Sequence, residues 1–296
     1  MKPTQNWSDG LPATYQELAG ATVRCAVVGY GAIRATADQL PSLRQNPGTY
    51  PARPIPPGFL KHADEQTVVV MAALLKAIER HGLAETCFTD WGVLAAPRFL
   101  GRITTIQALQ RFQAEGAWGI SPHLIPHRTL HAISGTISQA LQIHGPNLGV
   151  GGGPDAVVEV MRVAAAFMAN QDLPGLWVAM SGWDSEPIPP PAAAPKDVAP
   201  STNGHHAVSY CQALALALIP VPLVWDGPQL DFHLAALGSN GHKPRLAPPL
   251  FNLESFLAAL ESVSRAESWE RTGNNWSLSN GGYVELRIGA GMEKKR

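Results

Sequence analysis

The stretch "GPNLGVGGGPDAVVEV" (Gly145–Val160) indicates a short strand, a glycine-rich turn and the start of a helix. We expect the strand near residues 147–151 and the helix from about Pro154 to Asn170. Such a turn either binds an anion through free N–H groups at the helix N-terminus or presents a nucleophile at its tip. Pro154 removes one donor and Asp155 adds a negative charge, whereas proline followed by an acid is a good helix start. These residues therefore disfavour phosphate binding.

The same alternation of strands and helices extends along the chain. Apolar runs predict strands at Thr22–Ala32, Asp90–Pro97, Gly175–Asp184, His206–Val221 and Gly281–Gly289. Helical spacing predicts helices at His62–Leu83, Gly101–Gly116, His127–Gly145 and Asn252–Trp269. The alternation predicts the α/β fold class with a largely parallel sheet.

Composition limits the possible partners. The 296 residues are 45% hydrophobic and 15% charged, which is typical of a globular protein. A formal net charge of −1 without a long basic block argues against nucleic acid as the main partner. Cys25, Cys87 and Cys211 are far apart and unpatterned, which favours a reducing compartment. Because neither a signal peptide nor an apolar run of spanning length is present, we expect a cytoplasmic protein with no membrane span.

A nucleotide-binding turn is the first alternative for "VVGYGAIRA". It has Gly29 and Gly31 after a predicted strand, but Arg34 occupies the position of the third glycine. The following segment is rich in proline and does not predict a crossover helix. A plain strand-to-turn glycine pair is the better interpretation, and we expect no cofactor.

A metal or hydrolase centre is the second alternative. His123, His127 and His131 have four-residue spacing, which would gather metal ligands on one helix face. However, prolines interrupt the first part, and no acidic or cysteine residue lies nearby, so surface or core histidines are the commoner outcome. Ser134 and Ser181 lack the G-x-S-x-G pattern of a serine hydrolase.

Several segments carry a family resemblance. They are "AVVGYGAI", "HADEQTVVVMAALLKAIERHGL", "DWGVLAAP", "LIPHRTLHAISGTISQALQIHGPNLGV" and "DAVVEVMRVAAAFMANQDLPGLWVAMSGWD". In this order they resemble the β-ketoacyl-acyl-carrier-protein synthases of the thiolase-like superfamily, particularly short chain-length-factor-like proteins. The resemblance covers about Val23–Asp184, is weaker to Val221, and is most specific in "ISGTISQALQIHGPN". It implies a thiolase-like fold with a complete first βαβαβ-type half and a much reduced second half.

The resemblance also implies a degenerate active-site turn. In active family members a cysteine occupies the tip, where the helix N-terminus activates its thiolate. An ungapped alignment places Pro154 there, and a shift of one residue gives Gly153 or Asp155. None of these can attack a thioester. The two histidines and the glycine-rich motif of the family's second half are also missing, and "GSNGHKP" (Gly238–Pro244) is only faintly like one of them.

The resemblance therefore implies a catalytically inactive, chain-length-factor-like subunit for fatty-acid- or polyketide-type biosynthesis. Its partner would be an active ketosynthase or a second copy of itself, with acyl carrier protein as a further partner. The strand at 147–151 would lie at the dimer interface. Bulky side chains are candidates for the wall of an acyl tunnel or for the interface, although filling the core is the commoner outcome for any one of them. These candidates are Phe99, Leu100, Ile103, Phe112, Trp118, Asn147 and Val150.

Two other functions stay open. One is an acyltransferase or hydrolase with a non-standard centre that uses His127, His131 or Asp155. The other is a homodimeric scaffold that binds acyl groups or an acyl carrier. We expect a ketosynthase-like domain over residues 1–226, with an exposed Pro/Ala-rich loop at 185–202, and a short region at 227–296 with one helix and one strand.

Overall fold

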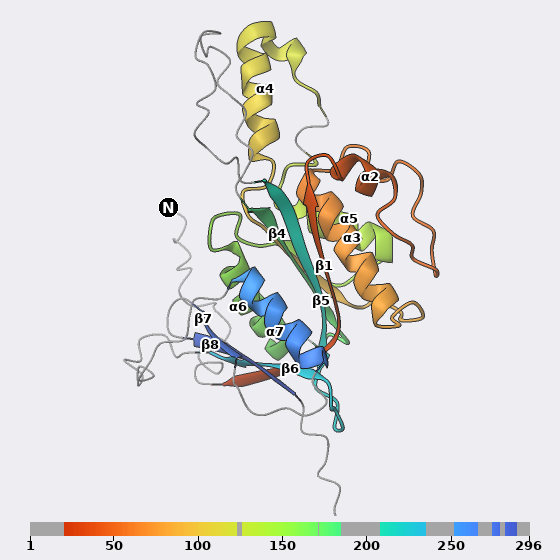
Figure 1. Ribbon diagram of the computed structural model, residues 1–296, viewed down its shortest axis with the longest axis vertical. Helices are drawn as coiled ribbons and strands as arrows, with labels where there is room; N and C mark the ends of the chain where they lie inside the picture. The colour runs from red at the N-terminus through yellow and green to blue at the C-terminus, as the bar shows by residue number, and fades with distance from the viewer. Residues whose placement is uncertain are drawn as a thin grey trace, which may run out of the picture.

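The chain folds around one eight-stranded sheet with six α-helices in its described part (Figure 1). The computed structural model describes residues 21–122, 126–170, 172–184, 208–234, 252–265, 274–278 and 282–288. The predicted loop at 185–202 and the motif Gly238–Pro244 lie outside these residues. The expected α/β class is confirmed.

The sheet has the strand order β3-β2-β4-β5-β1-β6-β8-β7. The strands are β1 (Thr22–Thr36), β2 (Gly92–Pro97), β3 (Asn147–Gly149), β4 (Leu176–Asp184), β5 (Tyr210–Pro220), β6 (Pro228–His233), β7 (Asn274–Leu278) and β8 (Gly282–Ile288). Among the described strands, only β2 is parallel to its neighbours, β3 and β4, and all other adjacent pairs are antiparallel. The sheet is therefore mixed and not largely parallel. Helical crossovers join β2, β3 and β4, whereas no described helix lies between β4 and β5.

Helices cover both faces of this sheet. They are α2 (Leu40–Gln45), α3 (Glu65–Arg80), α4 (Arg102–Glu115), the 3₁₀ helix η2 (Gly116–Gly119), α5 (His131–Leu141), α6 (Ala156–Asn170) and α7 (Leu253–Arg265). One hydrophobic cluster lies under α3 and α5, and a second lies under α6 and α7. By contrast, α4 projects from one end of the sheet (Figure 1).

The long strand β1 joins the two parts of the sheet. Its residues from Cys25 to Thr36 pair with β5 and those from Thr22 to Ala26 with β6, and the β5 register shifts between Val27 and Gly29. Helix α3 crosses β1 at Gly31, where a Cβ atom would lie 2.1 Å from the carbonyl oxygen of Ala73. Only glycine permits this close approach of strand and helix.

The C-terminal region extends this sheet. β6, β8 and β7 continue it beyond β1, and α7 packs into the same hydrophobic cluster as α6. In its described part, the second half of the fold is thus reduced to one helix and three strands. The sheet runs without a break across residues 226 and 227, so the two-domain division stays a prediction.

Candidate functional site

The glycine-rich turn forms the predicted strand, turn and helix. The amide of Val150 donates to the carbonyl of Ala95 on β2 at 2.8 Å, which anchors the start of the turn. The helix α6 begins at Ala156, two residues later than expected, because the carbonyl of Asp155 accepts from the amides of Val158 and Glu159 at 2.9 and 3.0 Å. Asp155 therefore stands at the helix entrance and outside its first turn.

Two glycines make the sharp bend. Gly151 and Gly152 have φ angles of +75° and +108°, a region in which residues with a Cβ atom are strained. At Gly152 a Cβ atom would lie 2.8 Å from a Leu130 methyl group, so the turn is packed closely on one side. At Gly153 a Cβ atom would meet nothing within 4 Å. The tip is thus open, and the exposed Pro154 beside it carries no reactive group.

No described cysteine lies in this turn. Cys25 and Cys211 are buried in β1 and β5, and burial raises the pKa of both thiols, that of Cys25 to about 12. Cys87 is exposed between α3 and β2, and hydrogen bonding with Thr89 lowers its pKa. Neither the buried thiols nor Cys87 can substitute for a nucleophile at the tip, because they belong to other elements.

Phe99 packs directly behind the turn. Its amide donates to the carbonyl of Gly152 at 2.9 Å, and its φ angle of 56° is unusual for a residue other than glycine. The Arg102 guanidinium lies 4.1 Å from the centre of the Phe99 ring. Leu100 and Ile103 are half-buried against the cluster under α3. The structure therefore brings three predicted tunnel residues together near the turn.

A cleft opens beside these residues at the carboxyl ends of β2 and β4. Phe99 and Ile103 line a narrow space together with acidic and polar residues at the start of α3 and with Trp183. An adjoining cleft of about 350 Å³ shares Ile103 and Trp183 and reaches α2. Carboxyl ends of parallel strands are the usual place for ligand sites in α/β sheets.

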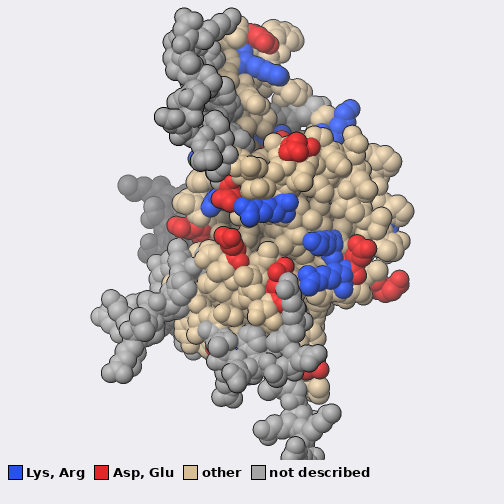
Figure 2. Space-filling model, in the orientation of Figure 1, with Lys and Arg blue, Asp and Glu red and all other residues tan. Residues whose placement is uncertain are grey.

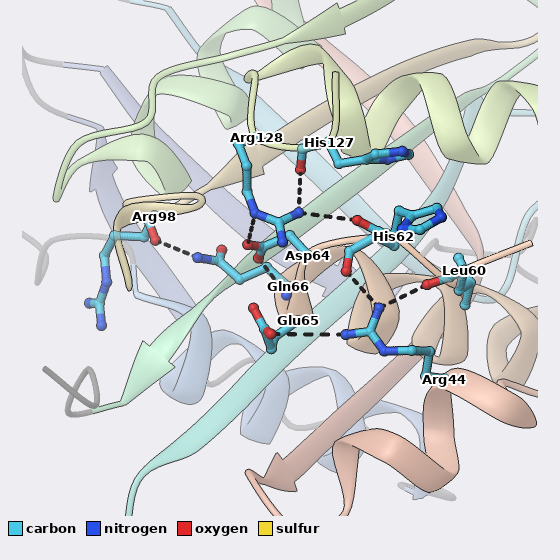
Figure 3. Close-up of polar contacts among 10 residues, drawn as sticks. Arg44, Leu60, His62, Asp64, Glu65, Gln66, Arg98, His127 and Arg128 are labelled. Carbon is cyan, nitrogen blue, oxygen red and sulfur yellow. Dashed lines mark hydrogen bonds and ion pairs between the residues drawn. The ribbon is translucent and has the colours of Figure 1, made fainter. Parts of the chain in front are cut away.

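A buried carboxylate forms the polar floor of this region (Figure 3). Asp64 is 2% exposed and accepts from the Gln66 amide at 2.9 Å, capping α3. The Arg128 Nε lies 3.3 Å from an Asp64 carboxylate oxygen, and its Nη1 donates to the carbonyls of His127 and His62. Burial, with the nearby Glu65 carboxylate, raises the pKa of Asp64 to about 6, although Gln66 and Arg128 oppose the shift.

Further hydrogen bonds join this floor to the sheet. The Gln66 side chain donates to the Arg98 carbonyl at 2.9 Å and accepts from the buried Ser181 hydroxyl at 3.0 Å. Arg44 pairs with Glu65 at 3.9 Å and donates to two carbonyls of the loop before α3. Sequence reasoning missed this network. A capping signal at Asp64 was available in "HADEQ", but the pairing with Arg128 joins distant segments and has no local signal.

The remaining predicted tunnel or interface residues lie at the surface. Phe112 and Trp118, on α4 and η2, have 52% and 99% of their surface exposed, and neither lines the narrow space beside Phe99 or the adjoining cleft. Val150 packs against the cluster under α6. Asn147, on the edge strand β3, donates to the Ser138 hydroxyl at 2.6 Å, and its buried Oδ1 has no described partner.

The histidine candidates do not form a described metal or catalytic cluster. The rings of His127 and His62 are 6.0 Å apart, and the exposed His131 lies 3.3 Å from the hydroxyl of the buried Ser134. His123 lies outside the described residues. Within the described ranges, no group of three or more His, Cys, Asp or Glu side chains is arranged to hold a metal ion.

No protein-family model matches the chain, and no curated protein matches it either. The chain is similar in fold to solved ketosynthase structures. One is the ishigamide ketosynthase/chain length factor, with 17% identity and a TM-score of 0.42 over 65% of this chain and 61% of that one. Another is a β-ketoacyl synthase from Burkholderia phymatum, with 12% identity and a TM-score of 0.46 over 81% and 69%.

A third is a ketosynthase in complex with its chain length factor from Xenorhabdus doucetiae, with 16% identity and a TM-score of 0.40 over 74% and 62%. The matched part thus spans about three fifths of the first and third of these structures. Within the part of the chain that the structure describes, no helix is both long and apolar enough to cross a membrane.

Proposed function

We propose that the chain is a catalytically inactive, chain-length-factor-like subunit that acts with an active ketosynthase in fatty-acid- or polyketide-type biosynthesis. The observation that carries the proposal is the sharp turn between β3 and α6, whose open tip has Gly153 and Pro154 where the sequence resemblance implies a cysteine. Without a thiolate at the tip, the chain forms no acyl-enzyme intermediate there. The bond-forming chemistry belongs to the partner.

The edge of the sheet supports the proposed pairing. Within the described part of the sheet, β3 is an edge strand of three residues, and Leu148 at its centre is 42% exposed. Leu130, 38% exposed, lies close behind the same turn. An open strand edge with apolar side chains is a site where a second chain can add hydrogen bonds and bury surface. On the face in Figure 2, acidic and basic side chains are interspersed and large areas are uncharged, which suits a protein partner better than a polyanion.

The projecting helix supports a second contact with that partner. No residue of α4 is buried, and Leu109 and Phe112 expose more than half of their surface. An isolated helix of this length gains little stability in water without an apolar partner surface. We therefore assign the segment α4–η2 (residues 102–119) to the interface, and Phe99, Leu100 and Ile103 at its base to the wall that limits the acyl chain.

Co-expression with a cysteine-containing ketosynthase and an acyl carrier protein encoded nearby tests the proposal. We expect the chain to elute with the ketosynthase on size exclusion and to release no product from an acyl thioester when alone. Leu148→Asp should abolish co-elution, because it places a charge on the strand edge. Val224→Asp is the matched control, since Val224 is also exposed, at 64%, but lies in the β5–β6 connection.

Three results would overturn the proposal. The first is separate elution from every neighbouring ketosynthase, including elution as a homodimer. The second is turnover of an acyl thioester by the chain alone, which would favour an enzyme with a non-standard centre. The third is equal loss of co-elution in Leu148→Asp and Val224→Asp, because the edge of β3 would then have no special role.

A further inference from the structure

A cleft away from the glycine-rich turn lies between the proline-rich loop before α3 and the end of α5. It has a volume of about 490 Å³, which is within the roughly 300–1,000 Å³ of small-molecule sites. The loop contributes Arg53, Ile55 and Phe59, and the end of α5 with the residues after it contributes Ser138–Ala140 and Gln142–His144. The two segments approach without closing on each other, which leaves the space between them.

The lining of this cleft separates into an apolar floor and a polar rim. Ala140 and Ile143 are buried, and Ile55 and Phe59 are half-buried, so they form the floor. The rim consists of the exposed residues Arg53, Gln139, Gln142 and His144. A floor of this kind binds a hydrocarbon body, while the rim fixes the orientation of a polar group.

The rim side chains have hydrogen-bonding capacity that the described chain leaves unused. Arg53, Gln139, Gln142 and His144 make no side-chain hydrogen bond or ion pair with any described residue. None of the described residues that line the cleft is acidic. The α5 C-terminus contributes a partial negative charge, so an anion has to be held by the Arg53 side chain and not by the helix. A guanidinium with free donors fits a carboxylate well.

We propose that this cleft binds an amphipathic monocarboxylate, with its hydrocarbon body against Ile55, Phe59 and Ile143 and its carboxylate on Arg53. The amides of Gln139 and Gln142 supply further donors at the rim. The site goes beyond the proposed pairing with a ketosynthase and does not depend on it. Ser138 lines the cleft and accepts a hydrogen bond from the Asn147 side chain of β3, whereas no residue of β3 lines the cleft itself.

Titration calorimetry on the isolated chain tests the site with three probes of matched shape. These are 4-phenylbutyrate, 4-phenylbutanol and 4-phenylbutylamine. We expect the carboxylate to bind about tenfold or more tightly than the alcohol or the amine, because only the carboxylate forms an ion pair with the Arg53 guanidinium in addition to hydrogen bonds. Arg53→Gln should remove this preference. Arg80→Gln at the end of α3 is the matched control, since Arg80 is exposed and lies outside the cleft. This variant removes an equal charge and should bind the probes like the unchanged chain.

A second variant tests whether the probes occupy the cleft, independently of the charge of Arg53. Gln139→Trp places a large side chain at the exposed rim, where it fills the cleft without entering the core, and it should weaken binding of all three probes. Thermal melting shows whether each variant is folded. The proposal is overturned if the three probes bind equally, if 4-phenylbutyrate does not bind, or if folded Arg53→Gln keeps the preference. A folded Gln139→Trp variant with unchanged affinity would also overturn it. None of these results bears on co-elution with a ketosynthase, so the two proposals can fail independently.

Discussion

Helices α3 and α4 have similar lengths but opposite environments. Twelve of the sixteen residues of α3 are buried, whereas none of the fourteen residues of α4 is. Helix α3 packs on the centre of the sheet, and α4 extends away from its end (Figure 1). Most helical stability in proteins comes from packing an apolar face. The sheet provides that packing for α3, whereas α4 has no buried residue and lacks it.

The caps and end charges of the two helices also favour α3 over α4. Asp64 caps α3, Glu65 lies in its first turn and Arg80 in its last, so all three charges favour the helix dipole. Helix α4 has no side-chain cap, begins at Arg102 and ends at Glu115, which places both charges at the unfavourable ends. The ends of α3 therefore stabilise that helix, whereas the ends of α4 do not.

The largest expected effect comes from removing one leucine from each helix. Leu74 is fully buried in α3 and Leu109 is 59% exposed in α4. Leu74→Ala should lower the free energy of unfolding by about 3 kcal/mol, because it leaves a cavity in the core. Leu109→Ala should change it by less than about 0.5 kcal/mol in the isolated chain. Urea denaturation of both variants measures the difference.

The same leucine pair also tests the proposed interface. In the presence of the ketosynthase, Leu109→Ala should weaken the complex, whereas its effect on the isolated chain stays small. A loss of several kcal/mol from Leu109→Ala in the isolated chain would contradict the contrast between the helices. It would show that α4 belongs to the chain's own core.

A smaller effect concerns the cap of α3 and its dependence on pH. The folded-state pKa of Asp64, about 6, lies above its ordinary value of 3.8 because of burial. Protonation therefore stabilises the folded chain, and this contribution is complete below about pH 3.8 and is lost as pH rises through about 6. From pH 7 to pH 5, the unfolding free energy should rise by about 1 kcal/mol more in the unchanged chain than in Asp64→Asn.

Asparagine is the suitable replacement because its carbonyl oxygen still caps α3 and does not titrate. Urea denaturation at several pH values in both proteins isolates the contribution of Asp64 from that of other groups. A difference between the two proteins that is constant with pH, or that changes in the opposite direction, would contradict the raised pKa. No comparable pH effect is expected at α4, whose N-cap is Gly101.

The smallest expected effect comes from the unfavourable charge of Glu115 in the last turn of α4. Glu115→Lys replaces an unfavourable charge in the last turn with a favourable one, which should stabilise the helix locally by about 0.3–1 kcal/mol. Amide hydrogen exchange in the last turn should slow by about twofold or more, while urea denaturation should change little. Glu115→Gln is the control and should give about half the effect. Unchanged exchange in both variants would mean that other contacts fix the end of α4.

Local patterns predicted most of the described elements. Strands β2, β4, β5 and β8 and helices α3, α4, α6 and α7 lie within or close to the predicted ranges, because their apolar residues recur with the period of each element. The short elements α2, β6 and β7 were missed, since a proline in α2 and polar residues in β6 and β7 weaken their patterns. Strand direction was also wrong, because direction depends on connections that periodicity does not encode.

The site was only partly predictable. The turn after β3 follows from its glycines, and the grouping of Phe99 with Ile103 follows from their places just before and within the first turn of α4. The pair of Asp64 and Arg128 depends on two segments that meet only in the folded chain. The cleft near Arg53 arises from the packing of a loop on a helix end, which no sequence pattern specifies.

The position of β1 in the sheet has a consequence for synthesis of the chain. Thr36 pairs with Tyr210, and Thr22 pairs with His233, so β1 has no strand partner until late in translation, although α3 can pack on one face of it earlier. Such pairings between distant segments fold slowly, and an exposed apolar strand can aggregate while it waits. A nascent chain that ends before β5 should therefore be cleaved by protease within β1. Once the chain has been synthesised through β6, both ends of β1 should become resistant to protease at the same time.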